Sequence, residues 1–259
     1  MQDGKLRNKP LVEALLELRW DLPTQVGSEL PSDPHYRLLL GRFSERIESA
    51  YPFHEALPTA EIPDAMAANV PQHRFRVSRG AWPLIQMGPG IMTVNETNGY
   101  EWATFRSRCE SAVEMLFDAH PSKGDLHIHS LTLRYIDAVD VDFSAESVFD
   151  FLRGKMKLDI SLPPSLFEDD RVKSNPSAFN WQVSFPHQIP GGLLTLRFAM
   201  GTRSGKPGIL WETLVQTERD SIPQMPLGFH IWLENAHSLT HDWFFKMIQG
   251  ELDRRFSGD

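Results

Sequence analysis

The chain carries the pattern Leu-x-Leu-Arg-aromatic twice, at residues 16–20 and again at residues 131–135. A motif that recurs at such an interval indicates an internal repeat, which constrains the architecture because each copy folds into the same unit. The elements expected around each copy follow the same order. We therefore interpret the chain as two related α+β repeats, residues 1–123 and residues 124–259.

The first half predicts a strand, a helix, three strands and a second helix. Its first strand alternates apolar and charged side chains, as half-buried strands do, and its second helix has apolar residues every three or four positions. Residues 52–63 contain three prolines and are expected to form a loop. The expected elements are a strand at 11–20, a helix at 33–51, strands at 75–78, 82–87 and 91–95, and a helix at 99–120.

The second half repeats this order. The expected elements are a strand at 126–139, a helix at 144–152 capped by Ser144, strands at 180–185, 193–200 and 209–217, and a helical region at 226–256. The predicted fold class is thus α+β, with an internally duplicated strand-helix-three strands-helix unit. We expect each half to form an antiparallel sheet covered by helices on one face, and the halves to pack about a pseudo-twofold axis. A cleft on that axis is the expected ligand site.

The repeated motif supplies the candidates for this cleft, Arg19, Arg134 and Tyr135. The two arginines would be related by the axis, so together they could contact an anion. The alternative is that each arginine forms an ion pair at a sheet edge with a nearby carboxylate, such as Glu17 or Asp137.

Two histidine pairs have the spacing of metal ligands. His127 and His129 would project from one face of a strand, and His237 and His241 from one face of the last helix. Imidazole is a common ligand of zinc and iron. Ser238 stands where the zincin helix motif requires a glutamate, which excludes a metalloprotease of that type. A bare metal site remains one hypothesis, and packing of His237 on the inner face of the helix with His241 nearer solvent is the other.

Three consecutive aromatic residues, Trp243, Phe244 and Phe245, lie on the expected last helix. Side chains on one helical turn point in different directions, so three such rings cannot all enter one core. A ring outside the core would contact the other half, a second copy of the chain or a partner protein. We therefore consider these residues a candidate interaction surface.

Composition narrows the class of protein. A length of 259 residues with 41% hydrophobic residues is typical of a folded globular chain. A net charge of −8 argues against nucleic acid as the main partner. We expect no membrane span and no secretion signal, because the sequence has no long apolar run. The single Cys109 cannot form an internal disulfide, which fits a cytoplasmic location.

Several segments resemble an uncharacterised, sporadically distributed bacterial protein family of about this length. Residues 8–20 read NKPLVEALLELRW and match its opening, N-x-P-L-V-E-A-x-L-E-L-R followed by Trp or Phe. Further agreement lies at residues 86–88, Asn95, residues 100–105, residues 133–137, and His237 followed by Phe244. The resemblance spans nearly the whole chain. It implies no activity, cofactor or catalytic residue, although a patchy distribution suits accessory or defence-associated genes.

The sequence contains no complete catalytic constellation. It has neither the Gly-x-Ser-x-Gly elbow nor a phosphate-binding loop with Walker spacing. Our leading hypothesis is a non-catalytic module that binds a small ligand or a protein partner, which includes a second copy of itself. The rival is a metal-dependent hydrolase with histidine ligands from the second half, for example His127 and His129 with His237 or Asp137. The sequence identifies neither catalytic residues nor a cofactor.

Overall fold

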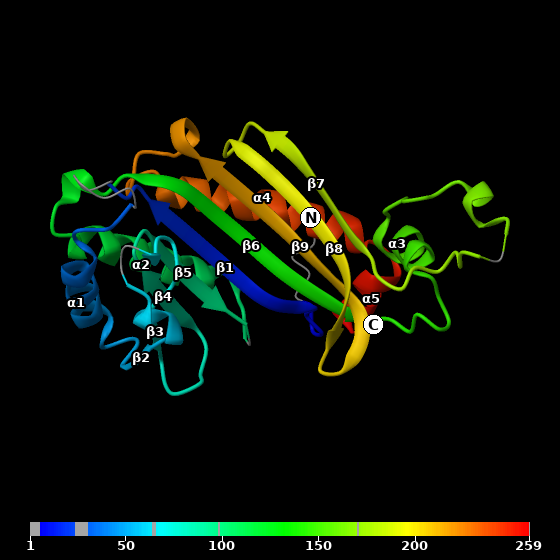
Figure 1. Cartoon of the computed structure of the whole chain (residues 1–259), viewed down its shortest axis with the longest axis horizontal. Helices are drawn as coiled ribbons and strands as arrows, with labels where there is room; N and C mark the ends of the chain where they lie inside the picture. Colours follow the sequence, from blue (N-terminus) through cyan, green and yellow to red (C-terminus); the bar gives the residue numbers. More distant parts are fainter. Residues whose placement is uncertain (1–5, 24–30, 64–65, 98, 170, 259) are drawn as a thin grey trace.

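The computed structural model describes residues 6–23, 31–63, 66–97, 99–169 and 171–258. The first five residues of the N-terminal stretch, for which we expect no secretion signal, lie outside these ranges. One antiparallel sheet of nine strands runs through the described part, in the order β2-β3-β4-β5-β1-β6-β9-β8-β7 (Figure 1). The strands are β1 (Leu11–Trp20), β2 (Phe53–Ala56), β3 (His73–Arg76), β4 (Leu84–Gly88), β5 (Ile91–Glu96), β6 (Ile128–Asp140), β7 (Asn180–His187), β8 (Gly192–Arg203) and β9 (Lys206–Glu218).

The helices cover one face of this sheet. Both long helices, α2 and α4, lie behind the sheet in Figure 1. None of the helices within the described ranges is both long and apolar enough to cross a membrane. The α-helices are α1 (Tyr36–Ile47), α2 (Trp102–Ala119), α3 (Val148–Met156), α4 (Phe229–Ile248) and α5 (Glu251–Ser257).

Mixed α+β structure, antiparallel strands and the order of the expected elements are confirmed. Three details differ from the sequence predictions. The loop expected at 52–63 contains the short strand β2, the final helical region is divided at Gly250, whose φ is 112°, and Ser147 rather than Ser144 caps α3. A left-handed backbone at Gly250 cannot continue an α-helix, so α4 ends before it.

The strands β1 and β6 form the centre of the sheet. Leu16 pairs with Leu133 and Leu18 with Leu131, so the two Leu-x-Leu segments lie opposite each other. We expected one sheet for each half, and the structure instead joins all nine strands into one sheet. On its other side each central strand has a neighbour from its own half, β5 or β9, and pairing of the two remaining edges satisfies their backbone groups.

Alternation along β1 and β6 separates the two faces of the sheet. Leu16 and Leu18 on β1, and Leu133 on β6, are fully buried on the helix-covered face. Glu17 and Arg134, one position away, are only half-buried and lie on the opposite face. The same rule brings Tyr135 and Asp137 to the helix-covered face, beneath α2 and α4.

Candidate functional site

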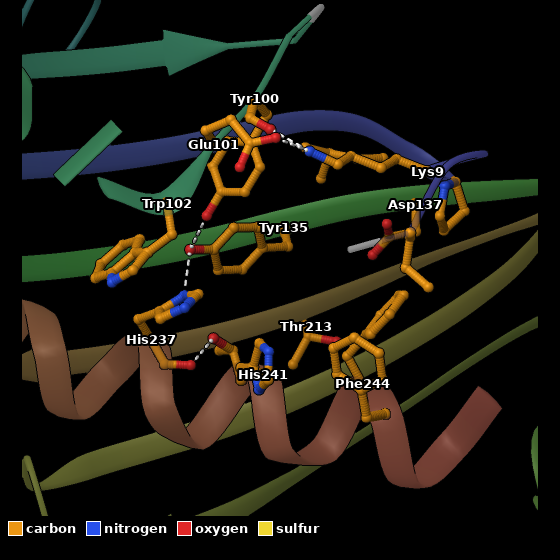
Figure 2. Close-up of a pocket in the computed structure, with 15 residues that line it drawn as sticks. Lys9, Tyr100, Glu101, Trp102, Tyr135, Asp137, Thr213, His237, His241 and Phe244 are labelled. Carbon is orange, nitrogen blue, oxygen red and sulfur yellow. Dashed lines mark hydrogen bonds and ion pairs between the residues drawn. The ribbon is translucent and has the colours of Figure 1, made fainter. Parts of the chain in front are cut away.

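A cavity of about 280 Å³ lies between the sheet, the start of α2, the middle of α4 and the N-terminal segment 6–11 (Figure 2). Tyr135 and Asp137 on β6 and Thr213 on β9 form its sheet wall. The complete lining consists of Leu6, Lys9, Pro10, Leu11, Tyr100, Glu101, Trp102, Tyr135, Asp137, Thr213, His237, Thr240, His241, Phe244 and Phe245. Residues from both predicted halves therefore build one site.

A chain of hydrogen bonds crosses one end of the cavity. The hydroxyl oxygens of Tyr100 and Tyr135 are 2.9 Å apart, and Tyr135 Oη lies 2.9 Å from His237 Nδ1 (Figure 2). The indole of Trp102 stacks on the His237 ring, with the centroids 3.6 Å apart and the planes 10° from parallel. These contacts hold the imidazole between α2, β6 and α4 and fix its orientation.

Burial keeps the side chains of Tyr100, Tyr135 and His237 uncharged at neutral pH. It raises the pKa of both Tyr100 and Tyr135, which disfavours phenolate. Burial, with a smaller contribution from His241, lowers the pKa of His237 from 6.5 to about 3. Because all three groups stay neutral near pH 7, they act there as hydrogen-bonding groups and not as ions.

Asp137 is the most unusual residue of the cavity. Its exposed fraction is 3%, and no hydrogen-bond or ion-pair partner for it exists in the part of the chain that the structure describes. Burial alone raises the pKa of this carboxyl from 3.8 to about 8. A buried carboxyl without a partner is costly, so such groups are concentrated at functional sites.

Thr213 adds a second unsatisfied group to the same wall. It is 1% exposed, and its Oγ1 has no hydrogen-bond partner among the described residues. Thr213 pairs across the strands with Tyr135, and Asp137 is the next residue of β6 on that face. Thr213 and Asp137 therefore line the same wall of the cavity.

An ion pair closes the other side of the cavity. Lys9 Nζ donates to Glu101 Oε1 at 2.8 Å and to the Tyr100 carbonyl oxygen at 2.6 Å. It thereby ties the N-terminal segment to the start of α2, as Figure 2 shows. The charge of Lys9 is thus already neutralised, and Lys9 is the only lysine or arginine among the lining residues.

Of the three cleft candidates from the repeated motif, only Tyr135 lines the cavity. Arg19 Nε donates to Glu17 Oε1 at 2.7 Å, and Arg134 Nε lies 3.3 Å from Glu212 Oε2. Both arginines occupy the uncovered face of the sheet. The ion-pair interpretation of these residues matches their surroundings, although the partner of Arg134 is Glu212 and not Asp137.

The first histidine pair lies away from the cavity. His127 precedes β6 and is exposed, and His129 Nδ1 lies 3.2 Å from Asp21 Oδ1 near the start of β6. The expectation that one strand carries both residues is not met, because β6 begins at Ile128.

The second histidine pair does lie together. His237 and His241 both line the cavity, with ring centroids 5.5 Å apart. His237 is the more buried of the two, while His241 is exposed. Within the described ranges, no group of three or more His, Cys, Asp or Glu side chains has an arrangement that could hold a metal ion.

The rings of Trp243, Phe244 and Phe245 are all half-buried on α4. The Trp243 ring packs against Phe185, with centroids 5.4 Å apart, and Phe244 stacks over Trp211 at 6.3 Å. Phe244 and Phe245 line the cavity, where their centroids are 5.1 Å apart. All three rings pack against one apolar core cluster, so the expectation that they could not share a core is not met. Phe244 and Phe245 also face the cavity.

Sequence reasoning did not assign the cavity to Tyr100, Trp102 or Thr213, and it considered Asp137 only as an arginine partner or a metal ligand. The sequence did contain a pattern that places Asp137 at the cavity. Counting by twos from Leu133 through Tyr135 places Asp137 on the apolar face of the strand, where a carboxylate is out of place. No comparable signal marks Thr213, since threonine is common in strands.

Comparisons with known proteins add no functional information. No protein-family model matches the chain, and a search of curated proteins finds no match. The geometry of the cavity is therefore the basis for a functional argument.

Proposed function

We propose that this protein is a non-catalytic binding protein that holds a small organic molecule in the cavity between α2, α4 and the sheet. The observation that carries the proposal is Asp137, a buried carboxyl that faces the cavity with no described partner. Such a group lowers the stability of the empty protein, and a ligand that bonds to it recovers that energy. Apolar and aromatic walls with a few polar groups are typical of small-molecule sites.

A small ligand is favoured over a protein partner. Of the candidate interaction residues, Phe244 and Phe245 line the cavity and Trp243 packs against Phe185, and all three are half-buried. The Tyr100, Tyr135 and His237 chain supplies fixed hydrogen-bonding groups that would orient a ligand.

A thermal-shift panel of small aromatic alcohols, amines and carboxylates tests this function. Thr213→Leu fills the cavity from the sheet wall, and Thr195→Leu places the same change on the uncovered face of the same sheet. We expect at least one compound to raise the melting temperature of the wild type and of Thr195→Leu but not that of Thr213→Leu. A panel that stabilises none of the proteins, or all three equally, contradicts the proposal.

We further infer that the chain arose by duplication, with residues 1–123 and 124–259 as the two repeats. The strand orders β1-β5-β4-β3 and β6-β9-β8-β7 run outward from the centre in the same sequence of elements, and the register of β1 and β6 is centred on the pair Glu17 and Thr132. These features support a pseudo-twofold axis through that pair. An experimental structure in which superposition of β1 on β6 fails to bring α2 onto α4 would argue against duplication.

Membership of the sporadically distributed bacterial family, and a cytoplasmic location, are also proposals. The opening motif and the Leu-Arg-Tyr segment support the first, and the single Cys109 supports the second. The motif residues have structural roles in the sheet, because in both copies the leucines are buried and the arginine forms an ion pair. Shared fold is therefore what the resemblance implies, and the ligand has to be argued from the cavity.

A further inference from the structure

The chemistry of the cavity restricts what it can hold, provided that it is a ligand site as proposed above. Its charged lining groups are Lys9, Glu101 and the ionisable Asp137. Lys9 and Glu101 neutralise each other, whereas Asp137 has no counter-ion in the described part of the chain. An anionic ligand would meet this carboxyl and no free cation. A cationic ligand would supply the missing partner.

The arrangement of acceptors fits an ammonium group. Asp137 and Thr213 lie on adjacent strands of one wall, and both have acceptor oxygens without described partners. An ammonium group carries several N–H donors, so it can donate to both residues at once. A hydroxyl has one donor and can satisfy only one of them.

The remaining walls suit an apolar body attached to a cation. Trp102, Tyr100, Phe244 and Phe245 contribute aromatic surface, and Leu11 adds aliphatic surface. Aromatic faces attract cations, and the attraction strengthens when water is excluded. The sheet wall of the cavity therefore binds the charged group of a ligand, and the aromatic and aliphatic walls contact its apolar part.

We propose that the ligand is a primary or secondary amine with an aromatic or aliphatic body, whose ammonium group bonds to Asp137 and Thr213 while the body lies between Trp102, Phe244 and Phe245. The proposal rests on the binding function inferred above and names its substrate class. It assigns Asp137 as the residue that determines specificity.

Protonation adds a distinguishing property. Asp137 has a pKa of about 8, so it must lose a proton before it can pair with an ammonium group. Affinity for the amine should then rise about tenfold per pH unit up to pH 8, with release of one proton. The other titratable or charged groups that face the site are Lys9 from the N-terminal segment, Tyr100 and Glu101 from the start of α2, Tyr135 from β6, and His237 and His241 from α4.

The test is a calorimetric titration of the full chain at pH 8 with 2-phenylethylamine, its isostere 2-phenylethanol, and the anion 3-phenylpropanoate. We expect the amine to bind at least about tenfold more tightly than the alcohol, because a charged hydrogen-bonded pair is stronger than a neutral one. The anion should not bind. Asp137→Asn should remove the preference for the amine, and Asp140→Asn, a matched change on the uncovered face of the same strand, should keep it.

The outcomes separate the two proposals. Equal affinity for amine and alcohol, with both lost in Thr213→Leu, would overturn the amine assignment and leave the binding function intact. Undiminished amine binding by Asp137→Asn would also overturn the amine assignment, and so would undiminished amine binding by Thr213→Val, which changes the same wall. No binding of the amine to the wild type overturns the assignment, and failure of the whole thermal-shift panel would overturn the binding function as well.

Discussion

Tyr135 Oη lies 2.9 Å from His237 Nδ1, and this contact joins the central strand β6 to helix α4. Tyr135 is also the middle member of the chain, because its hydroxyl bonds to Tyr100 as well. Removing it breaks two hydrogen bonds, while removing the Tyr100 hydroxyl breaks one.

We therefore expect Tyr135→Phe to lower the free energy of unfolding more than Tyr100→Phe does. Each bond contributes on the order of 1 kcal/mol, so the expected losses are about 2 and about 1 kcal/mol. Urea denaturation of the two variants and the wild type measures the difference. Equal losses would mean that one of the two bonds contributes nothing to stability.

The buried carboxyl of Asp137 should make stability depend on pH. Its pKa is 3.8 ordinarily and about 8 in the folded protein, so between these values the folded state holds a proton that the unfolded state releases. The resulting stability is complete below pH 3.8 and is lost as pH rises to 8, by about 1.4 kcal/mol per pH unit. Asp137→Asn has no such dependence.

Compared with the wild type, Asp137→Asn should gain stability as the pH rises from 5 to 8. Chemical denaturation of both proteins at these two values tests this expectation, and other titrating groups cancel in the comparison. A difference in unfolding free energy that is the same at both pH values would show that Asp137 is not a raised, buried acid.

His237 should act in the opposite direction, because its pKa is lowered from 6.5 to about 3. The neutral ring contributes stability above pH 6.5, which is lost as the pH falls toward 3 and the unfolded state binds a proton. His237→Phe keeps an aromatic ring beside Trp102 but does not titrate. Between pH 7.5 and pH 4.5 the free energy of unfolding of the wild type should fall more than that of His237→Phe. NMR should find the His237 ring of the wild type neutral at pH 5. A ring already protonated at pH 5 would contradict the prediction.

Close backbone packing between the start of β9 and the end of β6 should make Gly208 hard to replace. A Cβ at this position of β9 would lie 2.2 Å from the carbonyl oxygen of Val139 on β6. We expect Gly208→Ala to cost about 2 kcal/mol or more. Gly41→Ala is the control, since its Cβ meets nothing within 4 Å and alanine improves a helix by about 1 kcal/mol. A stability loss at Gly41 with none at Gly208 would refute this account of the packing.

Local patterns in the sequence correctly predicted most of the elements. The spacing of Trp102, Phe105, Cys109 and Val113 indicated α2, and alternation indicated β1 and β6. The strand β2 was missed because it has only four residues, flanked by prolines. Pairing of β1 with β6 into one sheet depends on contacts between distant segments, which local periodicity does not encode.

The candidate site was predicted only in part. Tyr135 was selected as a cleft residue and lines the cavity, and His237 and His241, which were selected as candidate metal ligands, line it too. Arg19 and Arg134 were selected for the cleft and lie on the other face of the sheet, because they alternate with buried residues. The two copies of the motif lie on the paired central strands β1 and β6, but the two separate sheets expected from them are one sheet. Face alternation, applied to Asp137, would have indicated the cavity wall.

Native mass spectrometry of the untagged protein, purified from its own host without chelator, tests most directly whether the cavity holds a ligand. We expect the wild type to carry a mass excess of one small nitrogen-containing organic molecule that is released on denaturation and is absent from Thr213→Leu. A wild type without any such excess, or with an excess of a single metal ion in its place, would show that the cavity does not hold the proposed ligand.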